Sequence, residues 1–215
     1  MYLPALFHEA RTPVLHDLIR AHPLAVLVTL DTRGLVANHI PMEIDAAAGE
    51  FGTLRGHVAR ANPVWKSHRP EVEAMAVFQG PHSYITPSYY PTKQETGKVV
   101  PTWNYATVHG YGPLRVIEDV AWLRQLVERL TDRHEAQRPR AASEVPWKVS
   151  DAPESFLDNM LLAIVGIEIP ISRLEGKWKV SQNRPPEDRA GVAAGLDTGG
   201  DPMRQAMAEL VRARG

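Results

Sequence analysis

The sequence predicts a mainly β fold with helices added around the sheet. Short apolar runs bounded by turn residues recur along the chain, as at 24–30 and 74–79. Helical spacing of apolar residues is confined to a few segments, the longest of which is 118–140. A chain of 215 residues can bury a sizeable core as one domain. We therefore expect one main domain over 1–184, a linker over 185–200 and a C-terminal helix over 201–215.

The first predicted hairpin joins a strand over 24–30 to a returning strand over 35–44. Pro41 lacks the N–H group that a β-ladder requires, which predicts an edge or a bulge at this position. The polar pair Asn38-His39 lies next to it. Two interpretations follow: the strand opens its backbone to a ligand here, or the pair simply faces a turn.

The next stretch combines a strand with a helix start. Residues 51–55 predict a short strand ending in Arg55, and 64–69 can form two helical turns. Asn62 suits the N-cap and Pro63 the first helical position. Free backbone N–H groups beside a cation favour a phosphate-sized anion. An ordinary strand–helix corner with a solvated arginine explains the same residues.

Aromatic and amide side chains alternate along a later strand. The buried strand over 74–79 should end at Gly80-Pro81. From residue 102, alternation puts Asn104 on one face and Trp103 and Tyr105 on the other. Such a strand suits a planar ligand, and it equally suits a sheet packed on a helix.

The last part of the chain contributes helices and one major strand. Thr12-Pro13 starts the first helix of the chain, and further helices are expected at 118–140 and 153–160, with a strand over 162–169. Lys179, Ser181 and Asn183 share a face if their segment is extended. This polar face can form the rim of a ligand site, or it can simply be solvated.

Composition excludes several classes of protein. The net charge of −1 gives no overall drive towards nucleic acid or an anionic membrane. The absence of cysteine excludes disulfides, thiolate zinc sites and a cysteine nucleophile, and it fits a reducing cytoplasm. No run of about 18 apolar residues and no signal peptide is found, and hydrolase and zinc motifs are absent. We expect a cytoplasmic protein without a metal site.

Several segments together resemble the PaiB-type FMN-binding regulator family, a branch of the flavin-binding split β-barrels. They occur in family order over roughly residues 1–190: Asn38 to Pro41, Gly56 to Pro63, Gly80 to Tyr90, Val100 to Tyr105, and Lys179 to Asn183.

The resemblance implies a six-stranded Greek-key barrel with helices outside it, in a homodimer that holds one FMN at each end of the subunit interface. Arg60 and the helix start at Asn62 would hold the phosphate, while the segments from Trp103 and Lys179 would close the isoalloxazine side, partly from the other subunit. The cofactor-binding residues implied are Asn38, His39, Ile40, Pro41, His57, Val58, Ala59, Arg60, Asn62, Trp103, Asn104, Lys179, Ser181, Gln182 and Asn183.

Two functions from different classes fit this resemblance. The first is a non-enzymatic flavin protein with a role in transcriptional control, although the basic clusters 133–140 and 204–214 are each only +2 and support direct DNA binding weakly. The second is an FMN-dependent oxidoreductase or flavin reductase using NAD(P)H, with His57, His109, Tyr89 or Tyr90 as proton donors. Haem binding is a third, lower-ranked hypothesis, because no histidine lies in a diagnostic motif.

Overall fold

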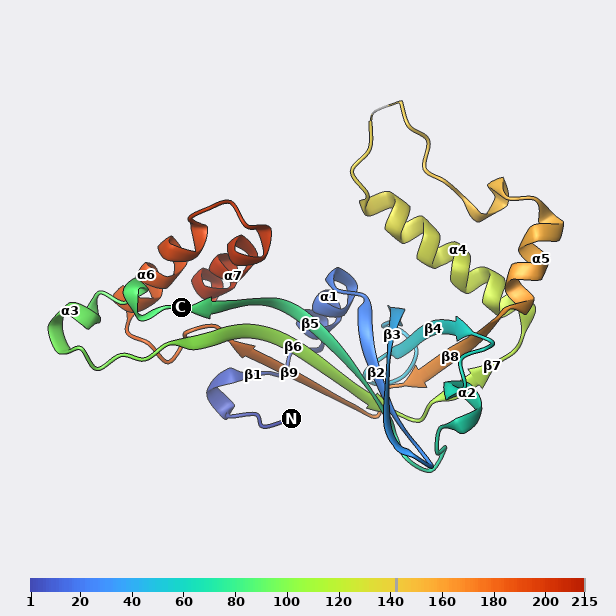
Figure 1. Ribbon diagram of the computed structural model, residues 1–215, viewed down its shortest axis with the longest axis horizontal. Coiled ribbons are helices and arrows are strands. Elements are labelled where there is room, and N and C mark those ends of the chain that lie inside the picture. The colour runs from blue at the N-terminus through green and yellow to red at the C-terminus, as the bar shows by residue number, and fades with distance from the viewer. Residues whose placement is uncertain (142, 215) are drawn as a thin grey trace. The chain divides into compact units, whose positions relative to one another are not determined.

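A computed structural model describes residues 1–141 and 143–214 (Figure 1). The chain divides into two compact units. Unit 1 contains Met1–His22, Val77–His109 and Leu174–Gly215, and unit 2 contains Pro23–Ala76 and Gly110–Arg173. Antiparallel strands dominate, with helices added, which confirms the mainly β prediction. Nine strands are found in the described residues, and the six strands expected for the barrel itself stay a prediction.

The strands of unit 2 follow the order β2-β3-β4-β8-β7. Their bounds are Leu24–Asp31 for β2, Gly34–Asp45 for β3, Thr53–Ala59 for β4, Arg115–Ile117 for β7 and Ile164–Pro170 for β8. All four pairings are antiparallel. The predicted hairpin of β2 and β3 is confirmed, with Leu24 opposite Pro41 and Asp31 opposite Gly34.

Strand β3 exchanges one partner for another at Pro41. Its residues from Gly34 to Pro41 pair with β2, whereas Met42–Asp45 pair with β4. Gly56 lies opposite Met42 at the end of this second ladder, and a Cβ atom there would lie 2.9 Å from the Pro41 carbonyl oxygen. Of the two predicted alternatives, an edge or a bulge, the edge is confirmed, because the β2–β3 ladder is interrupted after Pro41, where the missing N–H of proline is tolerated.

Strand β4 is longer than predicted. It continues beyond Arg55 to Ala59, and its last three residues stay paired with β8, Ala59 opposite Ile164. Arg55 lies inside the strand, where its guanidinium donates to Glu168 at 3.0 Å and to Asp45 at 2.8 Å. The expectation of a free cation at a strand end is therefore wrong for Arg55, because two carboxylates from neighbouring strands neutralise it.

Helices α4 (Val120–Gln137) and α5 (Glu154–Leu162) pack on the β4 and β8 side of unit 2 (Figure 1). The short helices α2 (Val64–Ser67) and η3 (Val149–Asp151) complete this unit. The apolar spacing of α4 buries Leu123, Leu126 and Leu130. Gly166 of β8 leaves room for the Trp122 ring, since a Cβ atom there would lie 2.4 Å from it.

The strands of unit 1 follow the order β1-β9-β6-β5. Their bounds are His8–Glu9 for β1, Ala74–Ile85 for β5, Thr102–Gly112 for β6 and Arg173–Lys179 for β9, so three of them end or begin in unit 2. The helices are η1 (Ala5–Phe7), α1 (Thr12–Ala21), η2 (Pro87–Tyr89), α3 (Thr92–Thr96), α6 (Pro186–Asp197) and α7 (Pro202–Ala213).

Strand β5 passes through Gly80-Pro81, where the sequence predicted its end. A Cβ atom at Gly80 would lie 2.8 Å from Leu18 Cδ1 and 3.1 Å from the Ala106 carbonyl oxygen. The glycine therefore allows close packing inside the strand, and it does not mark a turn.

Residues 185–200 form helix α6 over most of their length, where the sequence predicted a linker. Its glycines are contact positions, because a Cβ atom at Gly191 would lie 2.1 Å from the Tyr89 carbonyl oxygen and one at Gly195 would lie 2.3 Å from the Tyr89 ring. Helix α6 also packs against α7 (Figure 1). The expected C-terminal helix is found as α7, and Gly215 lies outside the described residues.

Candidate functional site

The divergence of β3 and β4 in unit 2 opens a pocket of about 300 Å³. We call it the fork pocket. It lies where the β3–β4 ladder ends at Met42 and Gly56. Eight of the fifteen predicted site residues line it, and one further residue, Ile164, was not predicted: Asn38, His39, Ile40, Pro41, His57, Val58, Ala59, Asn62 and Ile164.

Two asparagines hold one edge of the fork pocket together. Asn62 Nδ2 donates to Asn38 Oδ1 at 2.8 Å. The other end of the Asn62 amide, Oδ1, accepts from the Val64 backbone N–H at 3.0 Å, and the Asn62 N–H donates to the Ala59 carbonyl. Helix α2 begins at Val64 with Pro63 as its N-cap, so Asn62 lies one residue before the position predicted for it. Its side chain makes an Asx-type contact there and also positions Asn38.

Two buried polar atoms of the pocket residues have no partner within residues 1–141 and 143–214. They are Asn38 Nδ2 and His57 Nδ1. A buried donor or acceptor without a partner costs about 1–3 kcal/mol. Burial also lowers the pKa of His57, so its imidazole is neutral at pH 7. The pocket therefore offers an amide donor and a neutral imidazole between the apolar side chains of Ile40, Val58 and Ile164.

Arg60 follows the fork pocket but does not belong to its lining. Its guanidinium donates to the carbonyl oxygens of Leu162 at 2.7 Å and Ile164 at 3.1 Å, and to the Glu118 carboxylate at 2.6 Å. Three of its five N–H donors are thus engaged by described residues. The contacts fasten the end of β4 to the start of β8. Whether Arg60 also holds a phosphate stays a prediction.

The other six predicted residues form a cluster in unit 1, which we call the β6–β9 cluster: Trp103, Asn104, Lys179, Ser181, Gln182 and Asn183. Asn104 is buried and donates to Ser181 Oγ at 2.8 Å, while its Oδ1 has no partner in the described part of the chain. Lys179 Nζ donates to Thr102 Oγ1 and to the Trp103 carbonyl at 2.6 Å. Burial lowers the pKa of Lys179, and the cations Lys177 and Arg184 lower it further.

The end of β9 corrects one detail of the predicted rim. The strand stops at Lys179, and Ser181 has a positive φ of 66°. Gln182 Oε1 accepts from the Val180 N–H at 2.8 Å, which stabilises this turn. Because the segment is not extended, Lys179, Ser181 and Asn183 do not share a strand face. The alternation predicted for β6 is confirmed, with Asn104 buried and Trp103 55% exposed.

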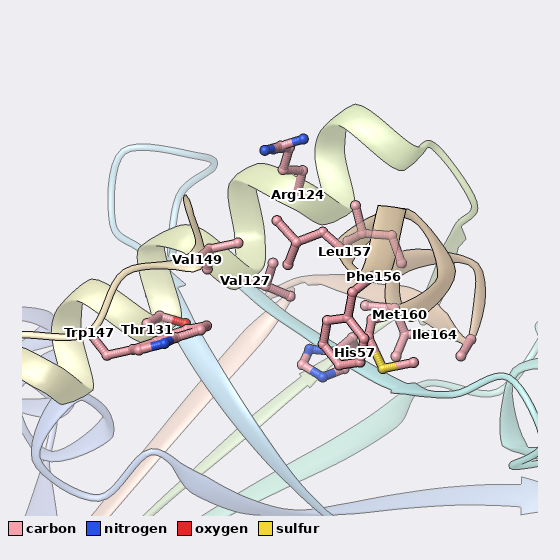
Figure 2. A pocket seen from close by; sticks show the side chains of 12 residues that line it. His57, Arg124, Val127, Thr131, Trp147, Val149, Phe156, Leu157, Met160 and Ile164 are labelled. Atoms are coloured by element: carbon pink, nitrogen blue, oxygen red, sulfur yellow. The ribbon is translucent and has the colours of Figure 1, made fainter. Parts of the chain in front are cut away.

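Ile164 is the pocket residue that sequence reasoning missed. It lines the fork pocket because β8 places it opposite Ala59. In the sequence, Ile164 is one apolar residue of a predicted buried strand, and nothing there distinguishes it as a ligand contact. His57 and Ile164 also line a second, apolar cavity under α4 and α5 (Figure 2).

No group of three or more His, Asp or Glu side chains in the described residues could hold a metal ion. None of the described helices is long and apolar enough to cross a membrane.

Comparison with known proteins defines the class of protein. A family model described as "Putative FMN-binding domain" matches residues 1–173. The chain belongs to this family of FMN-binding domains, and its sequence places it with the PaiB type. FMN or a related flavin is the cofactor of this family.

The similar proteins span most of the chain. An uncharacterized protein of Emericella nidulans is 38% identical, with 100% of this chain and 98% of that protein covered. The protease synthase and sporulation protein PAI 2 of Bacillus subtilis is 30% identical, with 98% and 96% covered. The solved structure of the flavocytochrome Anf3 from Azotobacter vinelandii has a TM-score of 0.56 at 11% identity, covering 80% of this chain and 69% of that one. This last likeness shows a fold of the split-barrel flavin-binding type.

The residues of the fork pocket fit a flavin. A flavin ring is flat and carries hydrogen-bonding nitrogen and oxygen atoms along one edge. Asn38 Nδ2 is a donor in need of a partner for this edge, and Ile40, Val58 and Ile164 are apolar walls. A volume of about 300 Å³ is at the lower end of the range for ligand pockets. FMN therefore needs a further wall besides these residues.

Proposed function

We propose that this chain is an FMN-binding protein of the PaiB type that holds the flavin ring in the fork pocket. The observation that carries the proposal is the unpartnered buried atom Asn38 Nδ2, in a residue that lines the fork pocket beside the interrupted ladder. When bound, FMN supplies electron-transfer chemistry. The residues of this chain would orient the ring, exclude water from it and offer hydrogen bonds to its polar edge.

We further propose that the protein works as a homodimer with the flavin at the subunit interface, within a closed six-stranded barrel core. The small volume of the fork pocket supports a second wall from elsewhere. The β6–β9 cluster of the second subunit is a suitable wall, because it combines an exposed indole, Trp103, with the unpartnered Asn104 Oδ1. Arg60 and the helix start at Asn62 are the groups proposed to hold the phosphate, and Lys179 is proposed to lie on the isoalloxazine side.

A role in transcriptional control is the biological function that the resemblance to PaiB-type regulators implies, and the similar protein of Bacillus subtilis is named for protease synthesis and sporulation. Direct contact with DNA has little support from charge. In the basic stretch 133–140, Arg138 pairs with Glu135 and Glu144. Arg212 of α7 pairs with Asp197, and Arg214, just after α7, pairs with Glu9. We therefore propose that any regulatory effect operates through a protein partner or through the flavin, in the cytoplasm.

An FMN-dependent oxidoreductase is the second candidate function. One observation favours it: the apolar cavity that shares His57 and Ile164 with the fork pocket offers space for a substrate beside the flavin. Reduction of bound flavin by NAD(P)H, followed by reoxidation when an acceptor is added, supports this function. Flavin that stays oxidised with both nicotinamides argues for the regulatory role.

The first experiment is the visible absorption spectrum of the purified protein with added FMN. We expect flavin bands at about one FMN per chain and no Soret band, which would instead indicate haem. The variant Asn38→Leu, which removes the unpartnered amide, should weaken FMN binding, whereas Asn159→Leu on the exposed face of α5 should leave it unchanged. A colourless protein in excess FMN, or equal effects of the two variants, would refute the proposed site.

A gel-shift assay at low ionic strength separates the regulatory alternatives. We expect no shift with promoter DNA, because the surface arginines named above are paired with carboxylates. A salt-sensitive shift would show direct DNA binding and would contradict the partner-mediated role.

A further inference from the structure

Helices α4 and α5 and the segment around η3 enclose a cavity of about 310 Å³ in unit 2. We call it the apolar pocket. Figure 2 shows Val127 of α4 and Phe156, Leu157 and Met160 of α5 around it, with the His57 ring projecting from β4 beneath them. The volume falls within the range of ligand pockets, about 300–1,000 Å³.

Large apolar side chains at the mouth of this pocket remain in contact with water. Trp147 is 47% exposed, Phe156 52% and Met160 45%. Grouped around one concave site, such side chains are typical of a surface that binds a ligand. A flat aromatic molecule would cover them most completely, since rings stack on Trp and Phe with a geometric preference.

The charge at the rim indicates an uncharged ligand. Arg124 is the one cation among the described residues that line the pocket, and both Glu154 and Glu128 bind it. A carboxylate or phosphate would therefore compete with two carboxylates for this guanidinium. A cationic ligand would lose its hydration against mainly apolar walls.

Among the polar side chains that line the apolar pocket, His57 has a buried nitrogen that needs a partner. His57 Nδ1 is buried and has none in the part of the chain that the structure describes. Burial keeps the imidazole neutral at pH 7 by lowering its pKa. A neutral imidazole can donate one hydrogen bond or accept one, so it suits a hydroxyl or a carbonyl oxygen.

We propose that the apolar pocket binds an uncharged aromatic molecule carrying one hydroxyl or carbonyl oxygen, with that oxygen hydrogen-bonded to His57. The pocket shares His57 and Ile164 with the fork pocket, so this ligand lies beside the flavin ring. The position of this ligand beside the flavin rests on the proposed function, whereas its binding in the apolar pocket does not. A second copy of this chain is a less suitable occupant, because a protein surface rarely supplies an oxygen deep in a concave apolar site.

The test is calorimetric titration of the full chain with 1-naphthol, with and without added FMN. The blocking variant is Val127→Trp, which fills the apolar pocket and lies outside the fork pocket lining. The matched control is Val120→Trp at an exposed position of the same helix. We expect saturable binding that falls at least about tenfold in Val127→Trp and is unchanged in Val120→Trp.

A second blocking variant guards against misfolding of the first. Met160→Trp alters a half-exposed side chain of the pocket and should weaken 1-naphthol binding in the same way. The wild-type protein should also bind 1-naphthol about five- to tenfold more tightly than naphthalene, and His57→Phe should abolish this preference.

Three outcomes would overturn the proposal. They are no saturable 1-naphthol binding, equal losses in Val120→Trp and Val127→Trp, or tighter binding of 1-naphthoate than of 1-naphthol. If the wild-type protein does not bind 1-naphthol, and Val127→Trp and Met160→Trp change the oligomeric state measured by sedimentation, this face is an interface with a second copy of the chain. Naphthol binding by a chain that does not bind FMN would refute the proposed function and leave this pocket standing.

Discussion

Asn62 Nδ2 donates a 2.8 Å hydrogen bond to Asn38 Oδ1 and so links the loop after β4 to the open edge of β3. The bond leaves Asn38 Nδ2 without a described partner. One asparagine thus orients the other, and the oriented amide is the donor that we assign to the flavin.

The variant Asn62→Ala tests this relationship. It removes the bond to Asn38 and the contact with the Val64 N–H, and we expect a loss of about 1–2 kcal/mol in the free energy of unfolding. Urea denaturation measures it. In a double-mutant cycle with Asn38→Ala, the coupling energy should be about 0.5–1.5 kcal/mol. Strict additivity of the two variants would show that the bond contributes nothing.

Arg60 provides the test of the phosphate prediction. If its guanidinium contacts the phosphate, Arg60→Ala should weaken FMN binding by about 1.5–3 kcal/mol through the loss of a charge-assisted bond. Riboflavin, which lacks the phosphate, should lose much less affinity. Fluorescence titration measures the affinity of each variant for FMN and for riboflavin. The control is Arg115→Ala at the exposed end of β7.

An equal loss for FMN and riboflavin would contradict the phosphate contact. That result would show that Arg60 acts through the carbonyl oxygens of Leu162 and Ile164, by keeping Ile164 in the wall of the fork pocket.

We expect the free energy of unfolding to fall at low pH because of Glu9. Its buried carboxylate accepts from Arg11 and pairs with Arg214, the residue that follows α7. The Arg11 hydrogen bond, with a smaller contribution from Arg214, lowers the pKa of Glu9 from 4.5 to about 2. A lowered carboxyl pKa stabilises the fold fully above pH 4.5, and this contribution is lost as the pH falls towards 2.

Glu9→Gln removes the charge and should lower the free energy of unfolding by about 1–3 kcal/mol at pH 7. The difference from wild type should shrink by pH 3 in denaturant titrations. A difference that is constant between pH 7 and pH 3 would show that packing of Glu9, and not its charge, is what matters.

Gly195→Ala tests whether α6 is a packed helix. Alanine usually stabilises a helix relative to glycine, but a Cβ atom here would lie 2.3 Å from the Tyr89 ring. We expect destabilisation of about 1–3 kcal/mol from overpacking, measured by thermal or urea unfolding. The same change in a Tyr89→Leu background should cost less. Stabilisation by Gly195→Ala in the native background would mean that α6 and Tyr89 do not pack in this way.

Local patterns predicted the elements well and their ends less well. The hairpin of β2 and β3, the apolar face of α4 and the interruption at Pro41 were all predicted, because alternation, helical spacing and a missing N–H act within a few residues. Gly80 and the glycines of α6 were misread as breakers. The sequence does not distinguish a glycine that ends a helix or strand from one that lets another part of the chain pack closely against it.

The sequence by itself determined the family, the β-rich character and the short segments that line the fork pocket. Asn38 to Pro41 and His57 to Ala59 are contiguous runs, so each could be identified from its own residues. Only the tertiary structure decided that they form one pocket, that Ile164 joins them, and that Arg60 binds carbonyl oxygens 102 and 104 residues away. The physical reason is that strand register and the pairing of distant strands depend on the packing of the whole unit, whereas capping, alternation and helical spacing depend on near neighbours.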